Sequence, residues 1–98
     1  MVLYEVTLEL EPSIADRVQA HMMQEHVPEI YATGCFQRIR FHQASPLLLR
    51  TSYEARGEAD LQRYLRDHAP RMRAEFQARF PAGVTLTRQT WTQLQCWE

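Results

Sequence analysis

The sequence predicts one α+β domain with its elements in the order β-α-β-β-α-β. Four segments alternate apolar and polar residues with the period of two that is typical of half-buried strands. Two longer stretches space their apolar residues as helices do. The length of 98 residues suits a single domain that spans residues 1–98. Together these observations favour a sheet covered by two helices rather than an all-helical or all-strand protein.

The first half of the chain predicts a strand followed by an interrupted helix. Residues 2–10 alternate, with apolar side chains at the even positions from 4 to 10. Ser13 is expected to cap the helix that follows. Pro28 should interrupt this helix, and a short helical piece should then end at Gly34. The apolar stripe of the helix is expected at Ile14, Val18, Met22 and Met23.

The second half predicts two strands, a helix and a last strand. The strands are expected at residues 35–43 and 47–56, the helix at 59–80, and the last strand from 84 to about 94. Pro81 and Gly83 separate the helix from the last strand. This order is typical of a ferredoxin-like sandwich, a four-stranded antiparallel sheet with strand order 4-1-3-2 and two helices on one face.

Composition excludes several classes of function. The formal net charge is −1, whereas a nucleic-acid-binding module normally shows a basic excess, so we expect no nucleic-acid partner. The chain has no run of eighteen apolar residues and no basic N-terminal region before an apolar run, so we expect no membrane span and a cytoplasmic protein. The two cysteines, Cys35 and Cys96, lack the spacing of a metal or disulfide site, and the three glycines form no phosphate-binding loop. The sequence therefore predicts neither a metal nor a cofactor.

An acidic-His-x-Pro element occurs twice, at residues 25–28 and 67–70. Each proline removes the N–H that would bond the carbonyl four residues earlier, and a polar side chain nearby could satisfy that carbonyl. The favoured interpretation is that His26 and His68 are structural residues at helix kinks. The alternative is that His26 acts as a general acid or base oriented by Glu29, since histidine titrates near neutral pH.

The sheet face that turns away from the helices should be polar and mixed in charge. It could be a solvated face with cross-strand ion pairs, a homodimer interface, or part of a small-molecule pocket; the homodimer is favoured because Trp and Arg are frequent interface residues. The residues predicted for this interface are Glu5, Thr7, Glu9, Arg50 and Trp91. A small organic anion is expected to bind Arg38 or Arg40, with Tyr31 close by.

Two stretches resemble a known family. Residues 26–36 have the pattern H-x-P-E-x-x-x-T-G-x-F, and residues 64–73 have the pattern Y-L-x-x-H-A-P-x-x-R. With the chain from Tyr4 to Trp91, they resemble a family of small bacterial proteins that is a domain of unknown function. That family is similar in topology to the dimeric α/β-barrel superfamily, which includes antibiotic-biosynthesis monooxygenases and EthD-like proteins. The resemblance implies a ferredoxin-like protomer that pairs sheet to sheet, and it assigns a role to no residue.

The sequence leads to two hypotheses about function, one for a binding domain and one for an enzyme. The first is a homodimeric, non-catalytic or regulatory domain that binds a small organic ligand, because the sequence shows no complete catalytic set. The alternative is a cofactor-independent enzyme of the monooxygenase or isomerase type, with His26 as acid/base and Glu29 as its orienter. Fold alone does not decide between them, since related folds carry unrelated functions.

Overall fold

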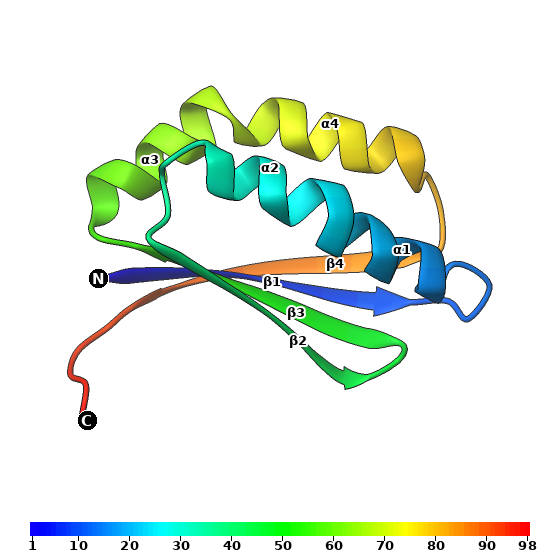
Figure 1. Ribbon diagram of the computed structural model, residues 1–98, viewed down its shortest axis with the longest axis horizontal. Helices are drawn as coiled ribbons and strands as arrows, with labels where there is room; N and C mark the ends of the chain where they lie inside the picture. The colour runs from blue at the N-terminus through cyan, green and yellow to red at the C-terminus, as the bar shows by residue number, and fades with distance from the viewer.

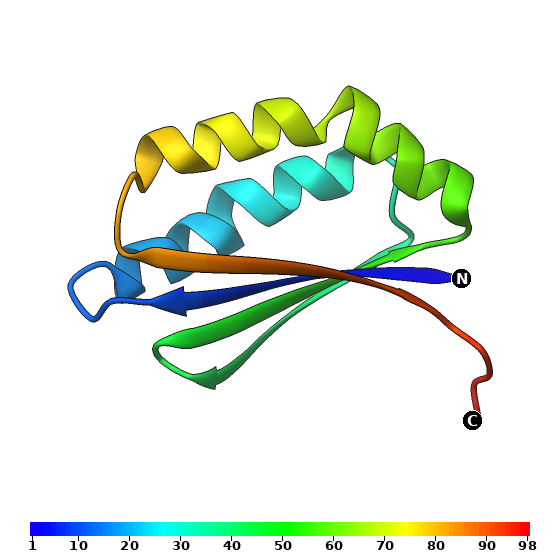
Figure 2. The same cartoon turned by 180° about the vertical axis from the view of Figure 1, so that it is seen from behind.

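The computed structural model describes all 98 residues, which form a sheet with a layer of helices on one side (Figure 1). The predicted β-α-β-β-α-β order is confirmed, with each helical arm divided into shorter segments. Viewed from behind, both arms cover the same face of the sheet and leave the other face open (Figure 2). The elements are β1 (Val2–Leu10), α1 (Ala15–His21), η1 (Met22–His26), α2 (Val27–Ala32), β2 (Arg38–Ser45), β3 (Leu48–Ala55), α3 (Glu58–Asp67), α4 (Ala69–Arg79) and β4 (Val84–Thr92).

The sheet has the strand order β2-β3-β1-β4, which is the predicted 4-1-3-2 order read from the other edge. All three pairings are antiparallel, and β1 lies between β3 and β4. Val6 of β1 stands opposite Thr51 of β3 and Arg88 of β4, so these three side chains point toward the helices. Glu5 stands opposite Ser52 and Gln89 on the open face. The strands β2 and β4 are the two free edges.

The core between the layers consists of two packed clusters. One gathers aromatic side chains around Tyr4, Tyr53 and Tyr64, with Ile30 and Met72 from the helices. The other gathers Leu8, Val18, Met22, Leu49, Phe76 and smaller neighbours near the opposite end of the sheet. Burial of each large apolar side chain contributes about 1.5–3 kcal/mol to stability. The partly buried Val6 packs against both clusters and joins them.

The first helical arm changes its hydrogen-bonding pattern just before Pro28. The segment η1 is a π-helix, and the N–H of Val27 donates to the carbonyl of Met22, five residues earlier. This wider turn relieves the clash that a proline ring makes with the carbonyl four residues before it. The interruption predicted at Pro28 is therefore confirmed, and its form is a π-turn.

Two details of this arm differ from the sequence prediction. Ile14, rather than Ser13, occupies the N-cap of α1, and no side chain caps the helix. Met22 is buried, but Met23 is 59% exposed, because adjacent helical residues point in directions about 100° apart. The apolar stripe is thus narrower than predicted.

The second arm, predicted as one helical stretch over residues 59–80 with a kink at His68, consists of two helices, α3 and α4. His68 separates them with φ −125° and ψ −39°, outside the helical range. Backbone hydrogen bonds of the helical type still span the break. The N–H of His68 donates to the carbonyl of Tyr64 (2.9 Å), and the N–H of Met72 donates to the carbonyl of His68 (3.1 Å). Pro70 has no N–H to donate, which explains why the arm bends at this point. The predicted start of the second strand is also wrong: Cys35 is buried in the aromatic cluster, and β2 begins at Arg38.

We predict that Thr51→Val stabilises the protein. Thr51 is fully buried on β3, and its Oγ1 has no hydrogen-bond partner. Replacing the hydroxyl by a methyl group of similar shape removes an unsatisfied polar atom, which should raise the free energy of unfolding by about 1 kcal/mol and Tm by about 5 °C. Thermal unfolding measures the change. Thr87→Val, on the exposed face of β4, is the matched control and should shift stability by less than about 0.5 kcal/mol; a loss of stability in Thr51→Val would contradict the prediction.

Candidate functional site

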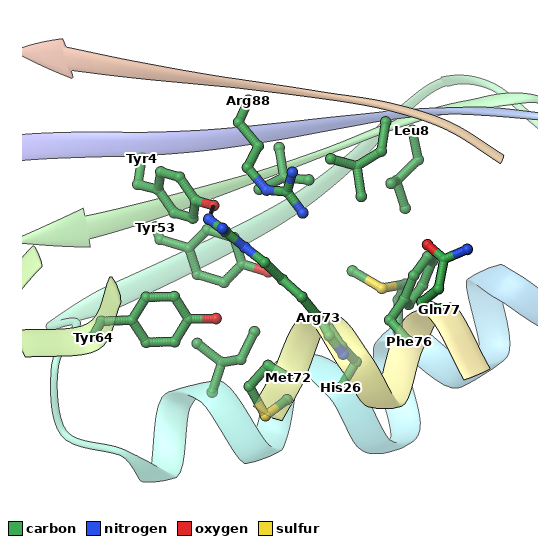
Figure 3. A pocket seen from close by; sticks show the side chains of 14 residues that line it. Tyr4, Leu8, His26, Tyr53, Tyr64, Met72, Arg73, Phe76, Gln77 and Arg88 are labelled. Carbon is green, nitrogen blue, oxygen red and sulfur yellow. Dashed lines mark hydrogen bonds between the residues drawn. The ribbon is translucent and has the colours of Figure 1, made fainter. Parts of the chain in front are cut away.

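A narrow cavity lies between the inner face of the sheet and the helices (Figure 3). Side chains from β1, β3 and β4 form one wall, and side chains from η1, α2, α3 and α4 form the other. The cavity volume is about 70 Å³, and ten of its fourteen lining residues are hydrophobic. The lining residues are Tyr4, Val6, Leu8, Met22, His26, Ile30, Tyr53, Tyr64, Met72, Arg73, Phe76, Gln77, Leu86 and Arg88.

Three tyrosines form one end of the cavity. The ring centroid of Tyr4 lies 5.8 Å from that of Tyr53 and 6.2 Å from that of Tyr64. Phe36 packs behind them, with its centroid 4.9 Å from that of Tyr64. Burial raises the pKa of the Tyr53 and Tyr64 hydroxyls above their usual value, so both stay protonated at neutral pH. This end of the cavity therefore offers flat aromatic surfaces with neutral hydroxyl groups.

Two arginines approach the cavity from opposite layers. Arg73 projects from α4 and its Nη2 donates a hydrogen bond to the hydroxyl of Tyr4 at 3.1 Å, whereas Arg88 projects from the edge strand β4 (Figure 3). Neither forms an ion pair with a carboxylate, although six of the eleven arginines do. Both guanidinium groups lower the pKa of Tyr64, against the larger effect of its burial. Their positive charges thus act on the same end of the cavity.

His26 reaches the cavity from the end of the π-helical segment. Its ring lies 5.4 Å from that of Phe76 in an edge-on arrangement and 5.9 Å from that of His21. Burial, helped by His21 and opposed by Glu75, lowers the pKa of His26 to about 4. No hydrogen bond ties the ring to a backbone carbonyl or to any other group. His26 is therefore a neutral imidazole at physiological pH, with both ring nitrogens free.

The other residues predicted for catalysis and ligand binding lie elsewhere. Glu29 pairs with Arg71 at 3.8 Å on the helix surface and makes no hydrogen bond with His26. Tyr31 and Arg38 border one shallow surface groove beside the edge strand β2. Arg40 forms an ion pair with Glu54 on the open face of the sheet. Of these residues the structure brings only Tyr31 and Arg38 together, and it places His26 alone in the cavity.

The residues predicted for the interface lie together on the open face of β1, β3 and β4. The carboxylate of Glu5 accepts a hydrogen bond from Ser52 at 2.9 Å and pairs with Arg50 at 3.5 Å. Thr7 stands opposite Arg50 and Thr87, and Glu9 lies on the same face two residues further along β1. Trp91 is 52% exposed, opposite Leu3. Glu5 and Arg50 are thus paired within one protomer, whereas Glu9 forms no ion pair.

Sequence reasoning missed the arginines and tyrosines of the cavity. A signal for Arg88 was present, because the alternation that places Thr87 and Gln89 on the open face turns Arg88 toward the helices. An arginine at an inward strand position departs from the usual apolar pattern and often marks a functional site. Arg73 and the tyrosines gave no such signal, since tyrosines are common in cores and arginines on helix surfaces.

A family comparison covers nearly the whole chain: one family model matches residues 1–94. The chain belongs to the family described as Domain of unknown function (DUF4286). This confirms the resemblance that the two sequence motifs indicated. No curated protein matches the sequence of this DUF4286 chain.

Several solved structures share the fold. An ethyl tert-butyl ether d (EthD) family protein from Bacillus halodurans is 14% identical, with a TM-score of 0.72 over 96% of this chain and 100% of that chain. A candidate antibiotic biosynthesis monooxygenase from Deinococcus radiodurans is 15% identical, with a TM-score of 0.73 over 100% and 97% of the two chains. A dimeric ferredoxin-like protein from an uncultured marine organism is 5% identical, with a TM-score of 0.72 over 100% and 99%. At these identities the comparisons show the ferredoxin-like fold of the DUF4286 chain.

Two further observations concern metals and membranes. No cluster of three or more His, Cys, Asp or Glu side chains in the structure is arranged to hold a metal ion. None of the helices combines the length and the apolar character needed to cross a bilayer.

We predict that His26 makes stability depend on pH. The unfolded chain binds a proton at His26 below about pH 6.5, while the folded chain resists protonation down to about pH 4, so stability falls as the pH drops through this range. From about pH 7 to 4.5 the wild type should lose about 2 kcal/mol more than His26→Gln does. Urea unfolding at a series of pH values measures the difference. His42→Gln, at an exposed position of β2, should follow the wild type; parallel curves for the wild type and His26→Gln would contradict the prediction.

Proposed function

We propose that this protein is a homodimeric, non-catalytic domain that binds a small organic molecule in the cavity of each protomer. One observation carries the proposal: a narrow, mostly apolar cavity between the layers is reached by several convergent polar groups. Ligand sites in proteins typically combine apolar walls with a few placed polar groups. Here the hydroxyls of the tyrosines, the imidazole of His26 and the guanidinium groups of Arg73 and Arg88 provide them.

The titration of His26 favours binding over catalysis. A general base works best when its pKa lies near the operating pH. Burial holds the pKa of His26 at about 4, so it is a weak base at neutral pH, and no carboxylate hydrogen-bonds to its ring. A neutral imidazole can still donate or accept a hydrogen bond to a ligand. The alternative, a cofactor-independent enzyme with His26 as acid/base, is supported by the place of His26 in the cavity and opposed by its pKa.

The open face of the sheet and the C-terminal tail support a homodimer. Figure 1 shows the tail after β4 leaving the sheet on the side opposite the helices. This tail and the end of β4 expose large apolar side chains: Trp91 is 52% exposed, Leu94 95% and Trp97 81%. Such side chains are frequent anchors of protein interfaces, and the open face of a second copy would cover them. One structural neighbour is described as a dimeric ferredoxin-like protein, which agrees with this assembly.

The cysteines fit a reducing compartment. Cys35 is buried, Cys96 is exposed, and both are free. We therefore place the protein in the cytoplasm, where disulfide bonds are rare.

We predict that the protein sediments as a dimer, at twice the protomer mass of 11.6 kDa. The double variant Trp91→Glu/Trp97→Glu should shift the equilibrium toward monomer, because it places charges among side chains that the second copy covers. Sedimentation equilibrium at about 10–100 µM measures both species. Met23→Glu, an equally exposed apolar position on the helix layer, is the control and should remain dimeric. A wild-type monomer over this range would exclude the homodimer.

We predict that filling the cavity abolishes ligand binding. Leu86 lines the cavity from the edge strand, so Leu86→Trp should occupy its free volume. Compounds from a broad panel of small organic molecules that raise Tm of the wild type should no longer do so in this variant. Leu94→Trp makes the same substitution in the exposed tail and should keep the wild-type response. Binding that survives Leu86→Trp unchanged would place the ligand elsewhere, and a panel without any binder would contradict the proposed function.

A further inference from the structure

We propose that the cavity is selective for small aromatic carboxylates, with the carboxylate held between Arg73 and Arg88 and the ring against the tyrosines. This inference rests on the proposed function, because it names the ligand class of the same cavity. The inference is based on the charges of the lining residues. Two of the fourteen are arginines, and none is acidic.

The cavity carries two positive charges without compensation. The chain contains twelve Asp and Glu residues, yet none lines the cavity, and His26 is neutral at physiological pH. Arg73 and Arg88 are both exposed to solvent, and both border a space whose lining is mainly apolar. An anion between them would gain charge-assisted contacts with both guanidinium groups. Elsewhere in the protein, arginines such as Arg40 and Arg50 meet carboxylates of the same chain.

The two guanidinium groups come from independent elements and reach the same region. Figure 3 shows the side chains of Arg88, from β4, and Arg73, from α4, extending toward the space beside Tyr4. The hydrogen bond from Arg73 to the Tyr4 hydroxyl, at 3.1 Å, uses one of five N–H donors and leaves the others available. A planar guanidinium group matches the two oxygens of a carboxylate, which makes such contacts strong and directional.

The walls select the rest of the ligand. The ring centroid of Tyr4 lies 5.8 Å from that of Tyr53 and 6.2 Å from that of Tyr64. Aromatic rings interact favourably at such distances. The cavity volume is only about 70 Å³, so the site is restricted to small ligands. Inorganic phosphate would satisfy the arginines but would leave the apolar walls without a partner. An aromatic carboxylate satisfies both parts of the site.

Benzoate and its neutral isostere benzamide test the proposal. Isothermal titration with the wild-type protein should show benzoate binding at least about 10-fold more tightly than benzamide, since charge-assisted hydrogen bonds are the stronger ones. Arg73→Gln and Arg88→Gln should each weaken benzoate binding about 10-fold and leave benzamide binding nearly unchanged. Arg17→Gln is the matched control, because Arg17 is exposed, lies outside the cavity and forms no ion pair. Thermal unfolding of each variant shows that the fold is retained.

The outcomes separate this inference from the proposed function. Equal affinity for benzoate and benzamide, with both lost in Leu86→Trp, would overturn the anion selectivity and leave the ligand cavity standing. Binding of inorganic phosphate as tight as that of benzoate would overturn the role of the aromatic walls. If benzoate fails to bind while neutral compounds of the panel do, the carboxylate class is wrong. If no compound binds, the proposed function fails together with the inference.

Discussion

The antiparallel pairing of β1 with β3 on one side and β4 on the other determines most of this structure. Because side chains along a strand alternate between faces, this register decides which residues meet the helices. It brings Tyr4 opposite Tyr53 and Val6 opposite Arg88, and it leaves Glu5 opposite Ser52 on the open face. A shift of one residue would exchange the two sets and place charges in the core. The positions of Tyr4 and Tyr53 at one end of the cavity, and of Arg88 beside it, depend on this register.

The prolines of the two helical arms have a second, local influence on the site. Ahead of Pro28 the chain forms a π-turn, and His26 lies at the end of that turn with its ring in the cavity. π-Turns are rare within helices and frequent at functional sites, because they redirect side chains that a regular helix would place elsewhere. Pro70 produces the corresponding break in the second arm, where His68 stacks on Tyr64 with ring centroids 6.3 Å apart. The repeated acidic-His-x-Pro element thus marks both irregularities, and only His26 lines the cavity.

The fold could be predicted from the sequence to a greater extent than the site. Alternation is a local property, so residues 2–10 indicated β1 with its exact bounds, and the order of the elements led to the correct sheet topology. A cavity is a property of tertiary packing, and its residues come from seven elements spread along the chain. Side-chain chemistry led to His26, which does line the cavity, and also to Glu29, Arg38 and Arg40, which point away from it. Only the inward position of Arg88 carried a signal that strand parity could have revealed.

Strand β1 serves both faces of the protein, and this explains how so short a chain can have two separate binding surfaces. Its even-numbered residues Tyr4, Val6 and Leu8 line the cavity, whereas Glu5, Thr7 and Glu9 belong to the open face that we assign to the second copy. The open face pairs several of its charges within the protomer, as in Glu5–Arg50 and Glu54–Arg40, whereas Glu9 and Arg38 on the same face have no ion-pair partner in the chain. The cavity leaves two arginines without a carboxylate. A net charge of −1 therefore conceals an uneven distribution of charge, in which two arginines border the cavity and no carboxylate does.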